Sequence, residues 1–125
     1  MDPRCTIRSV DEWKTVLRAA LREALRSRQA HALAVVRETL AAIENAEAPD
    51  SSAAPPLQEG VIAGAVAGLG AGDVERRILS PEAATAIVER EIRDRRDAAV
   101  TYTALGRHEE AKALMQQIDV LLALG

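Results

Sequence analysis

Residues 78–125, ILSPEAATAIVEREIRDRRDAAVTYTALGRHEEAKALMQQIDVLLALG, decide the fold because they have the pattern of one capped helical hairpin. Ser80 is a favourable N-cap, and Pro81 and Glu82 suit the first turn of the helix that follows. Apolar residues then recur at helical spacing up to Gly106, which can adopt the left-handed conformation that ends a helix. A second apolar periodicity begins almost at once, and so short a connection forces the two helices to lie antiparallel. The inward-facing positions are expected to be Ala84, Ile87, Val88, Ala98, Ala99, Tyr102 and Leu105 in the first helix, and Ala111, Leu114, Met115, Ile118, Leu121 and Leu122 in the second.

The amino-terminal part of the chain predicts a similar hairpin. Ser9 and Glu12 have the spacing of a capping box, and an apolar stripe that includes Trp13 and Leu17 follows them. A break near residues 27–30 separates this stripe from a second one that runs to about residue 47. We therefore expect an all-α fold of about four main helices in a single domain, residues 1–125, made of a first hairpin over 9–47, a Pro/Ala/Gly-rich connector over 48–78 and a second hairpin over 79–125.

Composition agrees with this fold class. A chain of 125 residues that is 48% hydrophobic and 28% charged fits one small domain, and the absence of Phe, with one Trp and one Tyr, argues against a strand-rich sandwich. Cys5 is the only cysteine, which excludes an internal disulfide framework. Because the sequence also has no signal-like or membrane-spanning apolar run, we expect a cytoplasmic protein without a membrane partner.

Residues that could form a catalytic, cofactor or metal site are scarce. The glycine-rich stretch 60–72, GVIAGAVAGLGAG, lacks the preceding strand and the terminal Lys-Ser/Thr of a phosphate-binding loop, so we interpret it as part of the connector. His31 and His108 lie on different hairpins without a His or Cys at ligand spacing. Cys5 has no evident base beside it. We therefore expect no catalytic residue, no metal and no cofactor.

The first 37 residues are locally basic, with eight Lys and Arg side chains against four acids. Four of the cations follow one another at intervals of four on the outside of the first predicted helix, and a fifth lies just beyond it. Such a row can contact nucleic-acid phosphates, although it is one helix wide, lacks interleaved aromatic residues and belongs to a protein of net charge −3. A solvated helix face is the alternative. The candidate RNA-contacting residues are Lys14, Arg18, Arg22, Arg26 and Arg28.

One charged pair lies within an otherwise apolar stripe. Glu91 and Arg95 are four residues apart in the middle of the third predicted helix, so they should meet each other and point toward the core or an interface. The structural interpretation is a partly buried ion pair that fixes the register between the hairpins. The functional alternative is a docking surface, where the same pair would confer specificity on a protein interface.

Two long segments resemble the YqeY-like family. They are LREALRSRQAHALAVVRETLAAIENAE at residues 21–47 and LSPEAATAIVEREIRDRRDAAVTYTALGRHEEAKALMQQIDVLLAL at 79–124, about 70 of the 125 residues. The resemblance is strongest at the helix end over 21–28, at the Asn-Ala-Glu stretch, at the paired arginines and at the Gly-Arg turn. The positions that match the family motif are Arg37, Asn45, Glu47, Arg96, Tyr102, Gly106 and Arg107.

The resemblance implies a non-catalytic accessory role. YqeY-like proteins have an amino-terminal helical domain and a carboxy-terminal domain similar to the tail of GatB, a subunit of the glutamine-dependent tRNA amidotransferase, a carbon-nitrogen ligase. This chain departs from the family by its long connector and by Gln116 and Gln117 at positions that are commonly acidic. We also expect the GatB-tail-like domain to be absent, because the sequence stops at Gly125 where the family continues. No residue inherits a catalytic role, so we expect no intrinsic amidotransferase activity.

Two functional hypotheses follow. The first is an accessory module that binds tRNA or a tRNA-bound protein complex through its basic helix face, and whose binding weakens with salt. The second is a protein-interaction or structural module without an RNA role. It would contact a protein partner or a second copy through the stripe around Glu91 and Arg95 or through residues 61–69, and its binding would resist salt.

Overall fold

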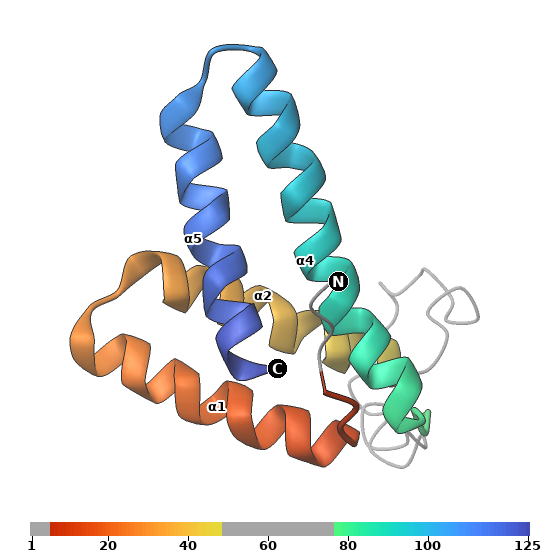
Figure 1. Cartoon of the computed structure of the whole chain (residues 1–125). Coiled ribbons are helices and arrows are strands. Elements are labelled where there is room, and N and C mark those ends of the chain that lie inside the picture. The colour runs from red at the N-terminus through yellow and green to blue at the C-terminus, as the bar shows by residue number, and fades with distance from the viewer. Residues whose placement is uncertain (1–5, 49–76) are drawn as a thin grey trace, which may run out of the picture.

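The protein folds into four helices within residues 6–48 and 77–125, the part of the chain that the computed structural model describes. These are α1 (Val10–Ser27), α2 (Ala30–Glu47), α4 (Pro81–Ala104) and α5 (His108–Leu124), and no strand occurs in the described ranges (Figure 1). The all-α prediction is confirmed. Our interpretations of Cys5 and of the glycine-rich stretch 60–72 fall on residues outside the described ranges.

The helices begin and end where local sequence signals place them. Ser9 and Glu12 form the predicted capping box, with hydrogen bonds of 3.1 and 2.9 Å between each side chain and the other residue's backbone N–H. The Ser80 hydroxyl accepts a 3.0 Å hydrogen bond from the backbone N–H of Ala83 at the start of α4. Gly106 has φ of +77° and ends the α4 region, as its position predicts. At the other turn a non-glycine residue, Arg28, takes the left-handed conformation, with φ of +56°.

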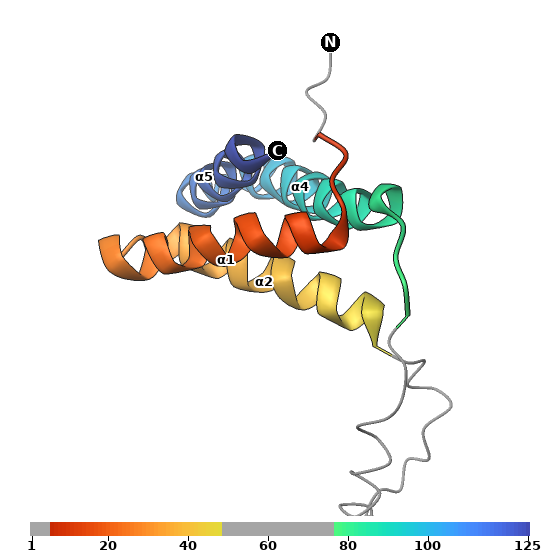
Figure 2. The ribbon, with the colours of Figure 1, turned by 90° about the horizontal axis from the view of Figure 1, so that it is seen from below.

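The two hairpins pack across each other as two layers. Helices α1 and α2 form one layer, and α4 and α5 form the other (Figure 2). The turn between α4 and α5 points away from the first hairpin, so the far end of the second hairpin extends beyond it (Figure 1). The backbone N–H of Arg77 donates a 2.7 Å hydrogen bond to the carbonyl oxygen of Glu47, which brings the two ends of the connector together. None of the helices in the described ranges has the length and apolar character required to cross a bilayer.

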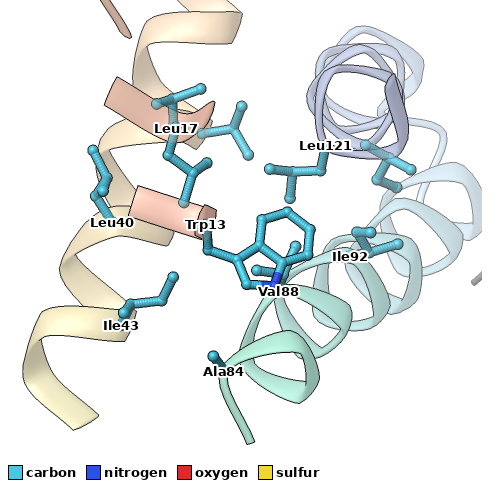
Figure 3. Close-up of a cluster of buried hydrophobic side chains, with 11 residues drawn as sticks. Trp13, Leu17, Leu40, Ile43, Ala84, Val88, Ile92 and Leu121 are labelled. Carbon is cyan, nitrogen blue, oxygen red and sulfur yellow. The ribbon is translucent and has the colours of Figure 1, made fainter. Parts of the chain in front are cut away.

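The hydrophobic core lies where the hairpins cross. Trp13 occupies its centre and faces side chains from α2, α4 and α5 (Figure 3). Two residues predicted to face inward are instead exposed, Leu105 by 65% and Met115 by 43%, because the far end of the second hairpin has no first hairpin against it. That part of the inward-facing prediction is wrong. The core cluster consists of Trp13, Leu17, Val35, Val36, Leu40, Ile43, Ala84, Val88, Ile92, Ile118 and Leu121.

A buried hydroxyl joins the start of the chain to the second hairpin. Thr85 accepts hydrogen bonds from the Trp13 indole N–H at 2.9 Å and from the Arg8 backbone N–H at 3.0 Å, and it donates to the Arg8 carbonyl oxygen. The Arg8 guanidinium lies over the Trp13 ring and donates to the carbonyl oxygen of Leu124 at 3.0 Å. These contacts hold the residues before α1 against α4 and the end of α5.

Candidate functional site

The predicted basic row does not lie entirely on the outer face of α1. The Lys14 ammonium group forms an ion pair with the Glu47 carboxylate, and the Lys14 side chain is only 12% exposed. The prediction that Lys14 lies on the outside is therefore wrong. The physical reason is the antiparallel return of α2, which brings its last residue back alongside the first turns of α1.

Acids on α2 and α1 also neutralise other members of the row. Arg18 lies 3.8 Å from the Glu44 carboxylate, and Arg26 lies 2.7 Å from that of Glu23. Both pairs are exposed to solvent. Glu38, Glu44 and Glu47 of α2 lie beyond residue 37, so the charge balance of the first 37 residues does not include them.

The remaining positive charge gathers at the closed end of the first hairpin, which we define as residues 21–37. This segment contains four arginines and only one acid, Glu23. Arg22, Arg28 and Arg37 are exposed, and none of the three forms an ion pair within the described residues. The RNA-contacting role of Arg18, Arg22, Arg26 and Arg28 stays a prediction, with this end of the hairpin as its most positive part.

Glu91 and Arg95 form the predicted ion pair, with 2.7 Å between the Glu91 carboxylate and the Arg95 guanidinium. The Arg95 side chain is only 9% exposed. It also donates to the Gln117 amide oxygen at 2.9 Å and pairs with the Glu38 carboxylate of α2. Arg95 therefore links α4 to α5 and to the first hairpin, a geometry typical of a structural ion pair at the crossing. Helical spacing predicts the Glu91 contact, whereas Glu38 and Gln117 reach Arg95 only through the tertiary fold.

The positions that match the YqeY-like motif do not form one cluster. Asn45 is exposed near the end of α2, and the Glu47 carboxylate pairs with Lys14 as described above. Arg37 is exposed at the closed end of the first hairpin. The remaining four, Arg96, Tyr102, Gly106 and Arg107, lie in the far half of the second hairpin.

The turn of the second hairpin has its own charge arrangement. The Arg107 guanidinium lies over the Tyr102 ring and forms a 2.8 Å ion pair with Glu110 in the first turn of α5. Hydrogen bonding from its own backbone N–H, followed by that from Arg107, lowers the pKa of the Glu110 carboxyl below its ordinary value. These contacts stabilise the start of α5 and leave Arg107 partnered.

Groups that could bind a metal ion do not occur in the described part of the chain. No three His, Cys, Asp or Glu side chains gather there closely enough for that purpose. His31 and His108 lie at the start of the second helix of different hairpins, and both are exposed.

A groove lies between α4 and α5, close to their turn. It has a volume of about 530 Å³, which lies in the range of about 300 to 1,000 Å³ typical of ligand sites. Val100 is 68% exposed on the α4 side, and Met115 lies on the α5 side. We call it the distal groove, and its lining residues are Arg96, Ala99, Val100, Thr103, Ala104 and Met115.

Sequence reasoning missed the distal groove because it assigned Met115 to the core. A usable signal was present on α4, where Arg96, Val100 and Thr103 follow one another at intervals of four and three residues. This spacing places them on one helix face beside the buried stripe. Whether that face is covered depends on how far the first hairpin extends, which local periodicity does not determine.

Arg96 is the charged member of the distal groove. Its side chain is exposed and forms no ion pair within the described residues, in contrast to its neighbour Arg95. Arg93 lies one turn before Arg96 on α4, and Lys112 lies one turn before Met115 on α5. Both are exposed, and neither has an ion pair in the described part of the molecule. The lining of the groove therefore combines mainly apolar side chains with the one positive charge of Arg96.

Comparison of the chain with family models, with curated proteins and with solved structures gave no match. The likeness to the YqeY-like family stays a prediction from the motifs quoted above. The geometry of the described residues is therefore the basis for assigning a function.

Proposed function

We propose that this protein is a non-catalytic helical module that binds an apolar segment of a partner protein in the distal groove. The supporting observation is the joint exposure of Val100 and Met115 beside a groove of about 530 Å³, at an end of the molecule that the first hairpin does not cover. Apolar side chains that are exposed together in a concave region are typical of interaction sites.

The composition of the groove favours binding over catalysis. Its only polar side chains are those of Arg96 and Thr103, and no His, Cys, Asp or Glu belongs to its lining. A nucleophilic hydroxyl such as that of Thr103 needs an adjacent general base to become reactive. The groove offers apolar contact and one positive charge, which suit recognition of a peptide.

A peptide-display selection tests this function directly. We expect helical peptides selected on the purified full chain to shift the amide resonances of Ala99, Val100 and Thr103 and to lose binding to Met115→Glu. The matched control is Leu25→Glu, which places the same charge at an exposed leucine of the first hairpin. Selected peptides that bind Met115→Glu as tightly as the unaltered protein contradict the proposed function.

A second candidate function is the RNA-linked accessory role that the YqeY-like resemblance implies, in association with tRNA-dependent amidation. The observation in its favour is the positive closed end of the first hairpin, with Arg22, Arg28 and Arg37 free of ion pairs in the described residues. Electrostatic contact with phosphates requires such unneutralised cations. For either function we propose a cytoplasmic location on the sequence argument alone.

Binding to bulk tRNA across a salt series separates this candidate from the first. The expected result is binding that weakens steeply with salt and is lost when Arg22, Arg28 and Arg37 are all changed to Glu. The control changes three exposed cations of the second hairpin, Arg90, Arg93 and Lys112, to Glu. No binding at low salt, or equal loss in both triple variants, contradicts an RNA site at the closed end.

A further inference from the structure

We infer that the distal groove binds an acidic amphipathic helix of a different protein, with an apolar side chain between Val100 and Met115 and a carboxylate paired with Arg96. This inference rests on the proposed function and specifies the chemistry of its partner.

The shape of the groove suits a third helix. Its walls belong to two antiparallel helices, and its lining residues on α4 form a stripe at helical spacing. Ala99 and Ala104 are small and let a neighbouring backbone approach closely, while the flexible side chain of Met115 adapts to the apolar group that enters. A helix laid along such a groove presents its apolar face as a series of side chains three and four residues apart. The completed arrangement is a three-helix packing.

The charge of the groove favours an acidic partner. Arg96 is the one charged residue in the lining of the groove, and it forms no ion pair within the described residues. No acid lies three or four residues from Arg96 on α4, which is the spacing of neighbours on a helix face. A partner carboxylate can therefore pair with the Arg96 guanidinium at the groove, whereas a cation at that point is repelled.

A second copy of the same chain fits the groove poorly. In a symmetric dimer the same patch faces itself, so the two distal grooves would lie against each other. That contact would bring the Arg96 guanidinium of one copy toward that of the other, and like charges across an interface oppose association. Arg96 therefore favours a partner that presents a carboxylate at this point.

Two synthetic peptides test the inference on the full chain. Both are about 15 residues long, near the length at which an isolated helix becomes stable, and share one leucine stripe. One has glutamates and the other lysines beside the stripe. By fluorescence anisotropy we expect the acidic peptide to bind up to about fivefold more tightly, since one exposed ion pair contributes up to about that factor. Arg96→Glu should reverse the preference, whereas Arg90→Glu, the same charge change on another face of α4, should leave it intact.

Each other outcome overturns the inference in a recognisable way. If both peptides bind equally and Met115→Glu abolishes both, the acidic partner is wrong while the proposed function stands. If neither peptide binds, or if Met115→Glu has no effect, the proposed function fails as well. If the free chain dimerises in light scattering and Met115→Glu restores the monomer, the occupant of the groove is a second copy.

Discussion

At the scale of single residues, the Thr85 hydroxyl satisfies three polar groups of two residues near the start of the chain, Arg8 and Trp13. Trp13 is fully buried at the centre of the core, and its indole N–H needs an acceptor there. Thr85 supplies that acceptor and also receives the backbone N–H of Arg8. A buried donor that has lost its acceptor keeps its desolvation cost without compensation. The position therefore matters through its oxygen atom as much as through its volume.

Thr85→Val removes this acceptor while it preserves the shape of the side chain. We expect the free energy of unfolding to fall by about 1 to 3 kcal/mol, because the buried Trp13 indole N–H loses its acceptor and the partly buried Arg8 N–H loses it as well. Urea denaturation followed by tryptophan fluorescence measures the change. Thr85→Ser retains the hydroxyl and should lose less than Thr85→Val. A Thr85→Val protein as stable as the unaltered chain contradicts the role assigned to the hydroxyl.

The contribution of Arg95 to stability depends on several partners at once, because a nearly buried cation needs more than one. Glu91→Ala should destabilise the protein by about 1 to 3 kcal/mol more than Glu89→Ala, since it removes one carboxylate from Arg95 and leaves Glu38 and Gln117. Glu89 is the matched control because it forms no ion pair within the described residues. Equal thermal unfolding midpoints for the two variants would show that Glu38 alone holds the cation.

At the scale of elements, the two hairpin turns reach the same backbone conformation with different residues. Gly106 adopts φ of +77° without steric cost, whereas Arg28 adopts φ of +56° despite its Cβ atom. A Cβ atom added at Gly106 meets no atom within 4 Å, so substitution there changes the backbone energy and creates no clash. The first turn thus contains a conformational cost that the second turn avoids.

Opposite substitutions at the two turns should therefore have opposite effects. We expect Arg28→Gly to raise the free energy of unfolding by about 0.5 to 1 kcal/mol, the relief of left-handed strain being partly offset by added freedom in the unfolded chain. Gly106→Ala should lower it by about 1 to 2 kcal/mol. Thermal unfolding of both variants beside the unaltered protein provides the comparison. Changes of the same sign would show that a feature other than the left-handed backbone controls the turns.

At the scale of the whole molecule, local spacing predicts the helices but not the contacts made by their crossing. The caps at Ser9 and Ser80, the turn at Gly106 and the Glu91 contact of Arg95 all involve residues at most four positions apart, so the sequence displays them directly. Trp13 and Thr85 are 72 positions apart, and Arg95 and Glu38 are 57 apart. The pairing of Lys14 with Glu47 likewise follows from how α2 returns along α1, and the exposure of the distal groove follows from how the two hairpins cross. Neither is encoded in the apolar periodicity.

The same crossing determines how the molecule should unfold. Trp13 is the only tryptophan in the chain and packs between α1 and the other three helices, so its fluorescence reports on the contact between the hairpins (Figure 3). Because each hairpin alone would expose its half of this core, neither should persist when the contact opens. We expect the fluorescence and far-UV circular dichroism transitions in urea to superimpose. Helical signal that survives the fluorescence change would mean that at least one hairpin holds together unaided. If that hairpin is α4 and α5, a second-hairpin fragment should retain the peptide binding of the full chain. Coincident transitions would instead make that binding depend on the packed first hairpin.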